Sequence, residues 1–199
     1  MRDSEPDVNQ RIARRVKELR AAQGFSLEAL AAKSGVSRSM ISLIERGESS
    51  ATAVVLEKLA AGLNVTLASL FDVPDANGQG SSPIARRDEQ PQWRDPGSGY
   101  LRRNVSPPGL PQPVQITEVH FPPGSRVAFE TGVRDTPVYQ QVWVLEGSID
   151  ITVGEERHSL REGDCLAMRL GVQTMFHNPT KTPARYAVVV ACESPSRTR

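Results

Sequence analysis

The sequence has few cysteines and no long apolar run, and each absence excludes a class of protein. Two cysteines among 199 residues are too few for a disulfide framework or a zinc cluster. Both Cys165 and Cys192 fall in apolar segments, so we expect buried, inert thiols rather than a redox pair. No stretch of 18 apolar residues exists, and the charged N-terminal segment lacks a signal peptide's apolar core. We therefore expect a cytoplasmic protein that does not associate with membranes.

The chain also lacks an overall excess of charge, but its charges are unevenly placed. Lysine and arginine together number 24, and aspartate and glutamate number 23. Residues 8–72 hold nine basic and six acidic residues, whereas the chain from residue 73 onward holds 14 of each. At this length two modest domains are expected. A mildly basic module followed by a neutral one is typical of a protein whose first part alone contacts DNA.

The segment SLEALAAKSGVSRSMISLIERG, which begins at Ser26, predicts two short helices joined by a tight turn. Ser26 and Ser37 are good N-caps, and Gly35 tolerates the positive φ that closes the first helix. Ile41 and Ile44 are three apart, which predicts that they share the core-facing side of the second helix. Arginine and serine side chains are then exposed at the start of that helix, as a helix that reads the DNA major groove requires.

Helices expected over residues 10–23 and 52–63, with a closing turn over 67–71, complete a five-helix, all-α module spanning residues 8–72. Its motifs LAAKSGVSRSMISLIERG and LEKLAAGLNVTLASLF resemble the XRE-type, lambda-repressor-like helix-turn-helix domain, at that family's usual spacing. Leu27 is a departure, because this family often has a phosphate-binding glutamine there. The resemblance implies binding to double-stranded DNA.

The side chains that we expect to contact DNA are Ser37, Arg38, Ser39, Ser42, Arg46, Arg15 and Lys17. Arg38 and Ser39 are best placed to reach base edges, with Ser42 behind them, and an arginine paired with guanine discriminates by about 1 to 3 kcal/mol. Arg46 and the basic residues of the first helix would contact phosphates. The alternative for the first helix is an ordinary solvated face.

After Phe71 the helical pattern ends at DVPDANGQGSSP, which predicts a flexible linker over residues 73–83. Strand-like runs then follow at 99–105, 114–121, 126–130, 139–145, 148–153, 165–168, 174–177 and 185–192. Many short strands separated by turn signals predict an all-β sandwich or barrel. The stretches VWVLEGSIDITVGEERHSLREGDCLAM and RLGVQTMFHNP resemble the two motifs of a cupin, a small jelly-roll barrel, over about residues 100 to 192. We expect a cupin-like sensor and dimerisation domain over residues 84–192.

The cupin resemblance locates the positions that hold a metal in metal-binding members. Those positions carry Arg134, Thr136, Gln140 and Thr174, none of them histidine or carboxylate. Arginine has no lone pair to donate, and amides and hydroxyls are poor replacements for imidazole. His177 lies three residues beyond the last position, on the opposite strand face. We expect no metal, no cofactor and no metal-dependent catalysis.

By motif position, the residues near the barrel mouth are Arg134, Thr136, Tyr139, Gln140, Thr174, Phe176 and Asn178. A guanidinium suits a carboxylate or phosphate, and amide side chains add orienting hydrogen bonds. We hypothesise that this pocket senses a small anionic metabolite, such as an amino acid or an organic acid. The alternative is that these side chains satisfy one another and fill the barrel.

An XRE-type domain followed by a cupin resembles a recognised type of bacterial transcriptional regulator. One helix-turn-helix buries too little surface for tight binding, so a homodimer on a pseudo-palindromic operator is expected. Trp143 would lie in core packing or at the dimer interface, and a ligand would act on the DNA-binding modules across the linker. The alternatives are a metal-dependent cupin enzyme fused to a DNA-binding domain, or an antitoxin-type autorepressor. The operator, the effector and the sign of regulation (repressor or activator) stay open.

Overall fold

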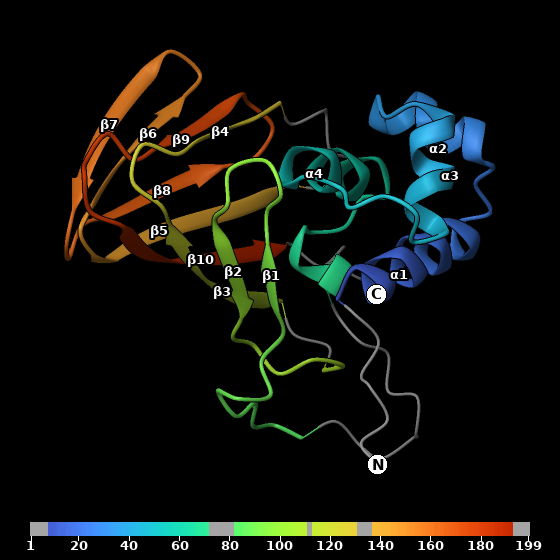
Figure 1. Cartoon of the computed structure of the whole chain (residues 1–199), viewed down its shortest axis with the longest axis horizontal. Helices are drawn as coiled ribbons and strands as arrows, with labels where there is room; N and C mark the ends of the chain where they lie inside the picture. Colours follow the sequence, from blue (N-terminus) through green and yellow to red (C-terminus); the bar gives the residue numbers. More distant parts are fainter. Residues whose placement is uncertain (1–7, 72–81, 111–112, 131–136, 193–199) are drawn as a thin grey trace, which may run out of the picture.

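In the computed structural model, residues 8–71, 82–110, 113–130 and 137–192 are described, and they form a helical part followed by a β-rich part (Figure 1). The helical elements are α1 (Val8–Ala22), α2 (Leu27–Ser34), α3 (Arg38–Glu45), α4 (Ala53–Gly62) and the 3₁₀ helix η1 (Ala68–Phe71). The predicted linker at 73–83 lies almost wholly outside the described residues, and so do Arg134 and Thr136.

Local side chains set the helix boundaries as the sequence predicts. The Ser26 hydroxyl accepts a hydrogen bond from the Ala29 amide at 3.1 Å, and the Ser37 hydroxyl accepts one from Met40 at 3.2 Å. Gly35 closes α2 at φ 68°, in the left-handed region that favours glycine. The helix-turn-helix is therefore specified largely by its own sequence.

The prediction of five helices is wrong, because the segment that closes the module is not an α-helix but a single 3₁₀ turn of four residues. The amides of Ser69 and Leu70 donate to the carbonyls three residues earlier, at 3.1 and 3.2 Å. The Thr66 hydroxyl also accepts from the Ser69 amide at 3.1 Å, which fixes the start of the turn. The module thus has four α-helices and η1.

The helical part encloses a fully buried core to which every α-helix contributes. Its most deeply buried side chains include Val16, Leu30, Ile41, Leu56 and Leu59. Burying each such aliphatic side chain contributes about 1.5 to 3 kcal/mol. A bidentate ion pair ties α1 to α3, with Arg20 Nε 2.6 Å from Glu45 Oε1, and its hydrogen bonds raise the pKa of Arg20.

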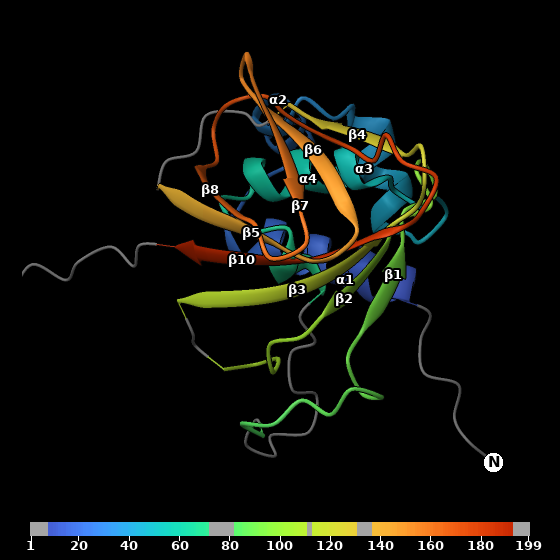
Figure 2. The ribbon, with the colours of Figure 1, turned by 90° about the vertical axis from the view of Figure 1, so that its left-hand side faces the viewer.

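The strands form two sheets, and Figures 1 and 2 show them stacked face to face. One sheet has the order β1-β2-β3-β10-β5-β8 and the other β4-β9-β6-β7, with all pairs antiparallel. The bounds are β1 Gln92–Arg94, β2 Leu101–Asn104, β3 Val114–Phe121, β4 Arg126–Phe129, β5 Val138–Glu146, β6 Ser148–Val153, β7 Glu156–Arg161, β8 Cys165–Arg169, β9 Thr174–His177 and β10 Ala184–Cys192. Among the described strands, no pairing joins the two sheets into a closed barrel.

Two strands and one cysteine differ from the sequence-based expectation. Strands β1 and β7 are absent from the strands that the sequence predicts. Strand β1 has only three residues and β7 reads ERHSLR, so neither shows a clear apolar alternation. Strand β7 is also an exposed edge strand. Cys165 is exposed rather than buried, because it pairs with Trp143 on the outward face of β8, at the edge of its sheet. The side chain of Cys192 is outside the described set.

The helical part docks on the β-rich part through α4 and η1, while α2 and α3 lie on the far side (Figure 1). The Phe71 ring of η1 packs on Trp93 of β1 with 5.6 Å between centroids. The carboxylate of Asp95 accepts a hydrogen bond from the Ala53 amide at the start of α4, at 2.8 Å. Among the described helices, none has the length and apolarity needed to cross a membrane.

Candidate DNA-contacting surface and interdomain cavity

The start of α3 presents a polar, exposed face opposite its buried side. Ile41 and Ile44 are buried, whereas Arg38 and Ser39 are exposed and Ser42 is half-buried. This is the arrangement that the sequence predicts for a recognition helix. In Figure 1 the helix lies on the side of the helical module away from the sheets, so the β-rich part does not cover it.

The two arginines of this surface are held by neighbouring acids. Arg38 Nε lies 2.6 Å from Glu28 Oε1 of α2, and both side chains are exposed. A hydrogen bond from the backbone amide of Glu28 lowers the pKa of its carboxyl group, and the charge of Arg38 lowers it further. Arg46 contacts Ser42 and forms an ion pair with Glu48 at 2.7 Å. Exposed pairs of this kind contribute little to stability, so the arginines can exchange them for DNA contacts.

The basic residues of α1 occupy different environments. Arg15 donates from Nε to the Ser69 carbonyl at 3.2 Å, which ties α1 to η1. Lys17 is exposed on the helix surface. A phosphate contact stays a prediction for both residues, and Arg15 also has a clear structural role.

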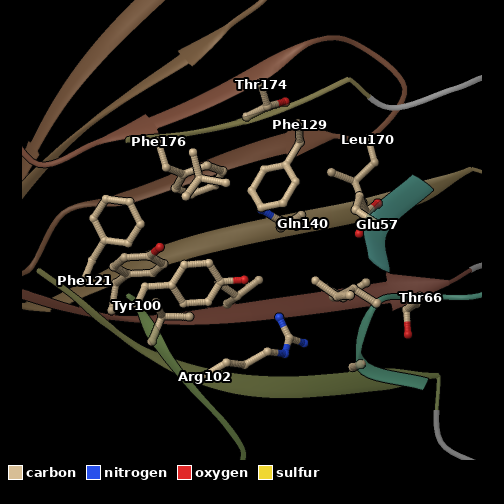
Figure 3. Close-up of a pocket in the computed structure, with 17 residues that line it drawn as sticks. Glu57, Thr66, Tyr100, Arg102, Phe121, Phe129, Gln140, Leu170, Thr174 and Phe176 are labelled. Atoms are coloured by element: carbon tan, nitrogen blue, oxygen red, sulfur yellow. The ribbon is translucent and has the colours of Figure 1, made fainter. Parts of the chain in front are cut away.

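A cavity lies between the β-rich part and the helical module (Figure 3). Its volume is about 70 Å³, several times what one water needs. Residues of both parts line it, and those from the helical module are Glu57, Thr66, Leu67 and Ala68. The cavity is therefore complete only while α4 and η1 are docked.

Aromatic rings form much of the wall and continue to the docked helix. Ring centroids are 5.6 to 6.2 Å apart along the series Phe71, Trp93, Tyr100, Phe121, Tyr186, Phe176 and Phe129. Spacings of this size are favourable for aromatic pairs. Burial raises the pKa of both tyrosines of the series, so their phenols stay protonated and can donate hydrogen bonds.

The cavity brings together three of the seven predicted ligand-binding residues. Gln140, Thr174 and Phe176 line it. Tyr139 does not: it is 45% exposed on the outer face of β5, because neighbouring residues of a strand point to opposite faces. Asn178 is fully buried outside the lining, where its amide donates to the carbonyls of Phe121 and Thr182.

Two charged residues that the sequence did not single out complete the lining. Arg102 of β2 donates from Nη2 to the Thr117 hydroxyl at 2.8 Å, and its guanidinium lies 5.4 Å from the Phe71 ring centroid. Glu57 of α4 is the other, and both residues are more than 90% buried. Figure 3 shows Arg102 extending from the strand side and Glu57 from the helix side of the same space.

Comparisons with known proteins agree with both parts of this architecture. A helix-turn-helix family model matches residues 16–70, and a cupin domain model matches residues 117–190. The chain is 29% identical to the HTH-type transcriptional regulator SutR of Escherichia coli (strain K12) over 165 residues, 82% of this chain and 84% of SutR. It is 38% identical to the control protein C.MunI of a Mycoplasma species over 66 residues, 33% of this chain and 89% of that protein. The crystal structure of an HTH_3 family transcriptional regulator from Vibrio cholerae superposes with a TM-score of 0.74 at 26% identity, covering 95% of this chain and all of that one.

The chain belongs to the XRE-type helix-turn-helix transcriptional regulators that carry a C-terminal cupin domain.

A metal of the kind that many cupins bind does not fit the described donor groups of this regulator. At the motif positions that would supply ligands, Gln140 and Thr174 line the cavity. An amide and a hydroxyl are weak donors for a first-row metal ion. No group of three or more histidine, cysteine or acidic side chains suited to a metal occurs among the residues that the structure describes.

The signal that would have revealed Arg102 in this regulator is weak. Arg102 is followed directly by Arg103 in the short strand LRRN, so the sequence does not tell which of the two arginines faces inward. Glu57 is flanked by Leu56 and Lys58 and resembles an ordinary acid of a surface helix. Its burial follows from docking on the cupin domain, which local periodicity cannot predict.

Proposed function

We propose that this regulator binds a pseudo-palindromic DNA operator as a homodimer and that its cupin domain senses a small molecule. The observation that carries the DNA half is the exposed polar start of α3, which lies away from the cupin domain. Arg38 and Ser39 would contact base edges from this end, with Arg46 on a phosphate. The Ser37 hydroxyl caps α3 by accepting from the Met40 amide, so at the DNA surface we propose that this residue positions the start of the helix.

Arg38→Ala tests the base contact, after the preferred sequence has been selected from random duplexes with the full-length protein. Fluorescence anisotropy should show a fall of about 10- to 150-fold in affinity for the selected sequence and a much smaller fall for random DNA. Arg161→Ala removes the same charge from exposed strand β7 and should change neither affinity. An equal loss on both DNAs would contradict base reading by Arg38.

The outer face of the six-stranded sheet supports the homodimer. Trp143 is 50% exposed there, and Tyr139, Ile116 and Val114 are exposed on the same face. Strand pairing sets these side chains beside Val189 and small alanines of β10, and Gln141 and Glu118 lie on the same face. The face is therefore rich in exposed apolar side chains. A second copy is the expected occupant, because a two-fold operator requires two recognition helices related by two-fold symmetry.

Trp143→Glu tests this interface by sedimentation. Wild type should sediment as a dimer at micromolar concentration and the variant as a monomer, with weaker binding to the two-half-site operator. Val172→Glu places the same charge on an exposed apolar residue in the turn before β9 and should leave the dimer intact. A dimeric Trp143→Glu variant would assign the interface to another surface.

The cavity supports sensing rather than catalysis. Among the described residues its lining offers a single carboxylate, Glu57, and neither histidine nor cysteine. Paired carboxylates and nucleophile–base pairs need groups that this lining does not provide. The relatives that match most of the chain are likewise named as transcriptional regulators.

A further inference from the structure

The cavity has two features that together restrict what it can bind. Its walls are mainly apolar and aromatic, which suits a ligand with an apolar body. Its charged lining consists of Arg102, from the cupin domain, and Glu57, from the DNA-binding domain. These two formal charges cancel, so the described lining does not favour an anion in the way that an arginine alone would.

A zwitterion matches such a lining better than a plain organic acid. An arginine binds a carboxylate through parallel N–H donors, and a glutamate accepts hydrogen bonds from an ammonium group. The Thr117 hydroxyl and the Phe71 ring contact the guanidinium of Arg102 and restrict its motion, which lowers the entropy lost when it binds a ligand. The protonated phenols of Tyr100 and Tyr186 offer further O–H donors.

We propose that the cavity binds an amino acid with an apolar side chain, its carboxylate on Arg102 and its ammonium group on Glu57. The proposal rests on the sensing role proposed above and names the ligand class. Gln140 comes from the same sheet as Arg102 and Thr174 from the facing sheet, and both add hydrogen-bonding groups to the lining (Figure 3).

This placement makes the ligand part of the domain interface. Arg102 belongs to β2 and Glu57 to α4, so an amino acid that contacts both joins the two domains. Ligand binding and domain docking are then thermodynamically linked. The docked arrangement binds the amino acid more tightly than the undocked one, and the bound amino acid raises the equilibrium constant for docking by the same factor. The orientation of α3 relative to the cupin dimer, and hence operator affinity, then depends on the amino acid.

Calorimetric titration of the full-length protein tests the ligand class with matched probes. The leucine series comprises L-leucine, 4-methylpentanoate, which lacks the ammonium group, and 3-methylbutylamine, which lacks the carboxylate. The phenylalanine series comprises L-phenylalanine, 3-phenylpropanoate and 2-phenylethylamine. In one series at least, the amino acid should bind about 10- to 100-fold more tightly than either analogue.

Glu57→Gln assigns the ammonium contact. The variant should lose that preference, with weaker binding of the amino acid and unchanged binding of the carboxylate analogue. General destabilisation would instead weaken both. Glu130→Gln is the matched control, because Glu130 pairs with Lys58 across the same interface at 3.3 Å without lining the cavity. This variant should keep wild-type affinities.

Hydrogen exchange provides the readout of coupling. The saturating amino acid should slow exchange of backbone amides in α4 and η1, and less so in Glu57→Gln. Equal binding of amino acid and carboxylate analogue would overturn the zwitterion, and binding of neither series would overturn the ligand class. If the same preparations still bind the selected operator, the inference alone fails and the proposed regulator stands.

Discussion

Replacing Asp95 by asparagine is expected to loosen the contact between the two domains. Asp95 is 3% exposed and lies in the turn between β1 and β2. Its Oδ1 accepts a hydrogen bond from the Ala53 amide of α4 at 2.8 Å. Its Oδ2 accepts from the Ser98 amide at 2.8 Å and from the Ser98 hydroxyl at 2.6 Å. One carboxylate therefore serves both the cupin turn and the first turn of a helix in the other domain.

The magnitude follows from counting donors. Asparagine keeps one oxygen, so whichever way its amide is oriented, one buried backbone donor faces an NH₂ group. An unsatisfied buried donor costs about 1 to 3 kcal/mol, and loss of a negative charge at a helix N-terminus adds about 0.3 to 1 kcal/mol. We expect a loss of about 2 to 3 kcal/mol. For a chain of this length that corresponds to a fall in Tm of roughly 4 to 12 °C.

Trp93 reports on the same interface. It is buried between the Phe71 and Tyr100 rings, whereas the chain's other tryptophan, Trp143, is half exposed. In a Trp143→Phe background, fluorescence comes from Trp93 alone. Asp95→Asn should shift that emission to longer wavelength at temperatures below unfolding, because a loosened helical module admits water to the ring.

A matched control separates this effect from the general loss of an aspartate in a turn. Asp164 accepts a hydrogen bond from the Arg161 amide at 2.9 Å, in the turn before β8. Asp164→Asn should lower Tm without changing Trp93 emission. If Asp95→Asn left both Tm and emission at their wild-type values, the interdomain cap would not hold the domains together and the reasoning would be refuted.

Two further predictions concern single carboxylates. Glu28→Gln should strengthen binding to the selected operator several-fold in fluorescence anisotropy, because it releases Arg38 and removes a negative charge beside DNA. Weaker binding would mean that the Glu28–Arg38 ion pair orients Arg38 for its DNA contact. Burial raises the pKa of Asp150, but hydrogen bonds from Ser159 and Arg157 outweigh it, so the pKa lies below its ordinary value. The resulting stabilisation is present above the unfolded-state pKa, near 4, and is lost as pH falls through the lower folded value. Urea unfolding should therefore show wild type more stable than Asp150→Asn by about 1.5 to 3 kcal/mol at pH 7, with the difference shrinking toward pH 2, and a constant difference would contradict this assignment.

The elements that the sequence predicts best are those set by local chemistry. The caps at Ser26 and Ser37, the left-handed Gly35 and the buried pair Ile41 and Ile44 each depend on residues a few positions apart. Strands β3, β6 and β9 also have the predicted bounds. In these segments the period of the side chains and the turn residues give the same answer, so no long-range contact overrides it.

The cavity was harder to predict because its lining depends on strand parity and on docking. Tyr139 and Gln140 are neighbours on β5, so they cannot both face inward, and parity alone would have excluded one of them. Which one faces in is decided by pairing, since Gln140 lies opposite Val190, another lining residue. Glu57 joins the site through contacts with a domain whose first strand begins at Gln92.

Direct contact also changes how a ligand signal would reach DNA. A flexible linker transmits little, because ordering one of its ends leaves the other end many conformations. Here η1 contacts the cupin domain on its own: Phe71 packs on Trp93, and Thr66, just before it, contacts Gln115 of β3. Thr66 also lines the cavity, so a ligand there acts on a residue that already joins the two domains. The energy with which a ligand discriminates docked from undocked arrangements then sets the size of the regulatory effect.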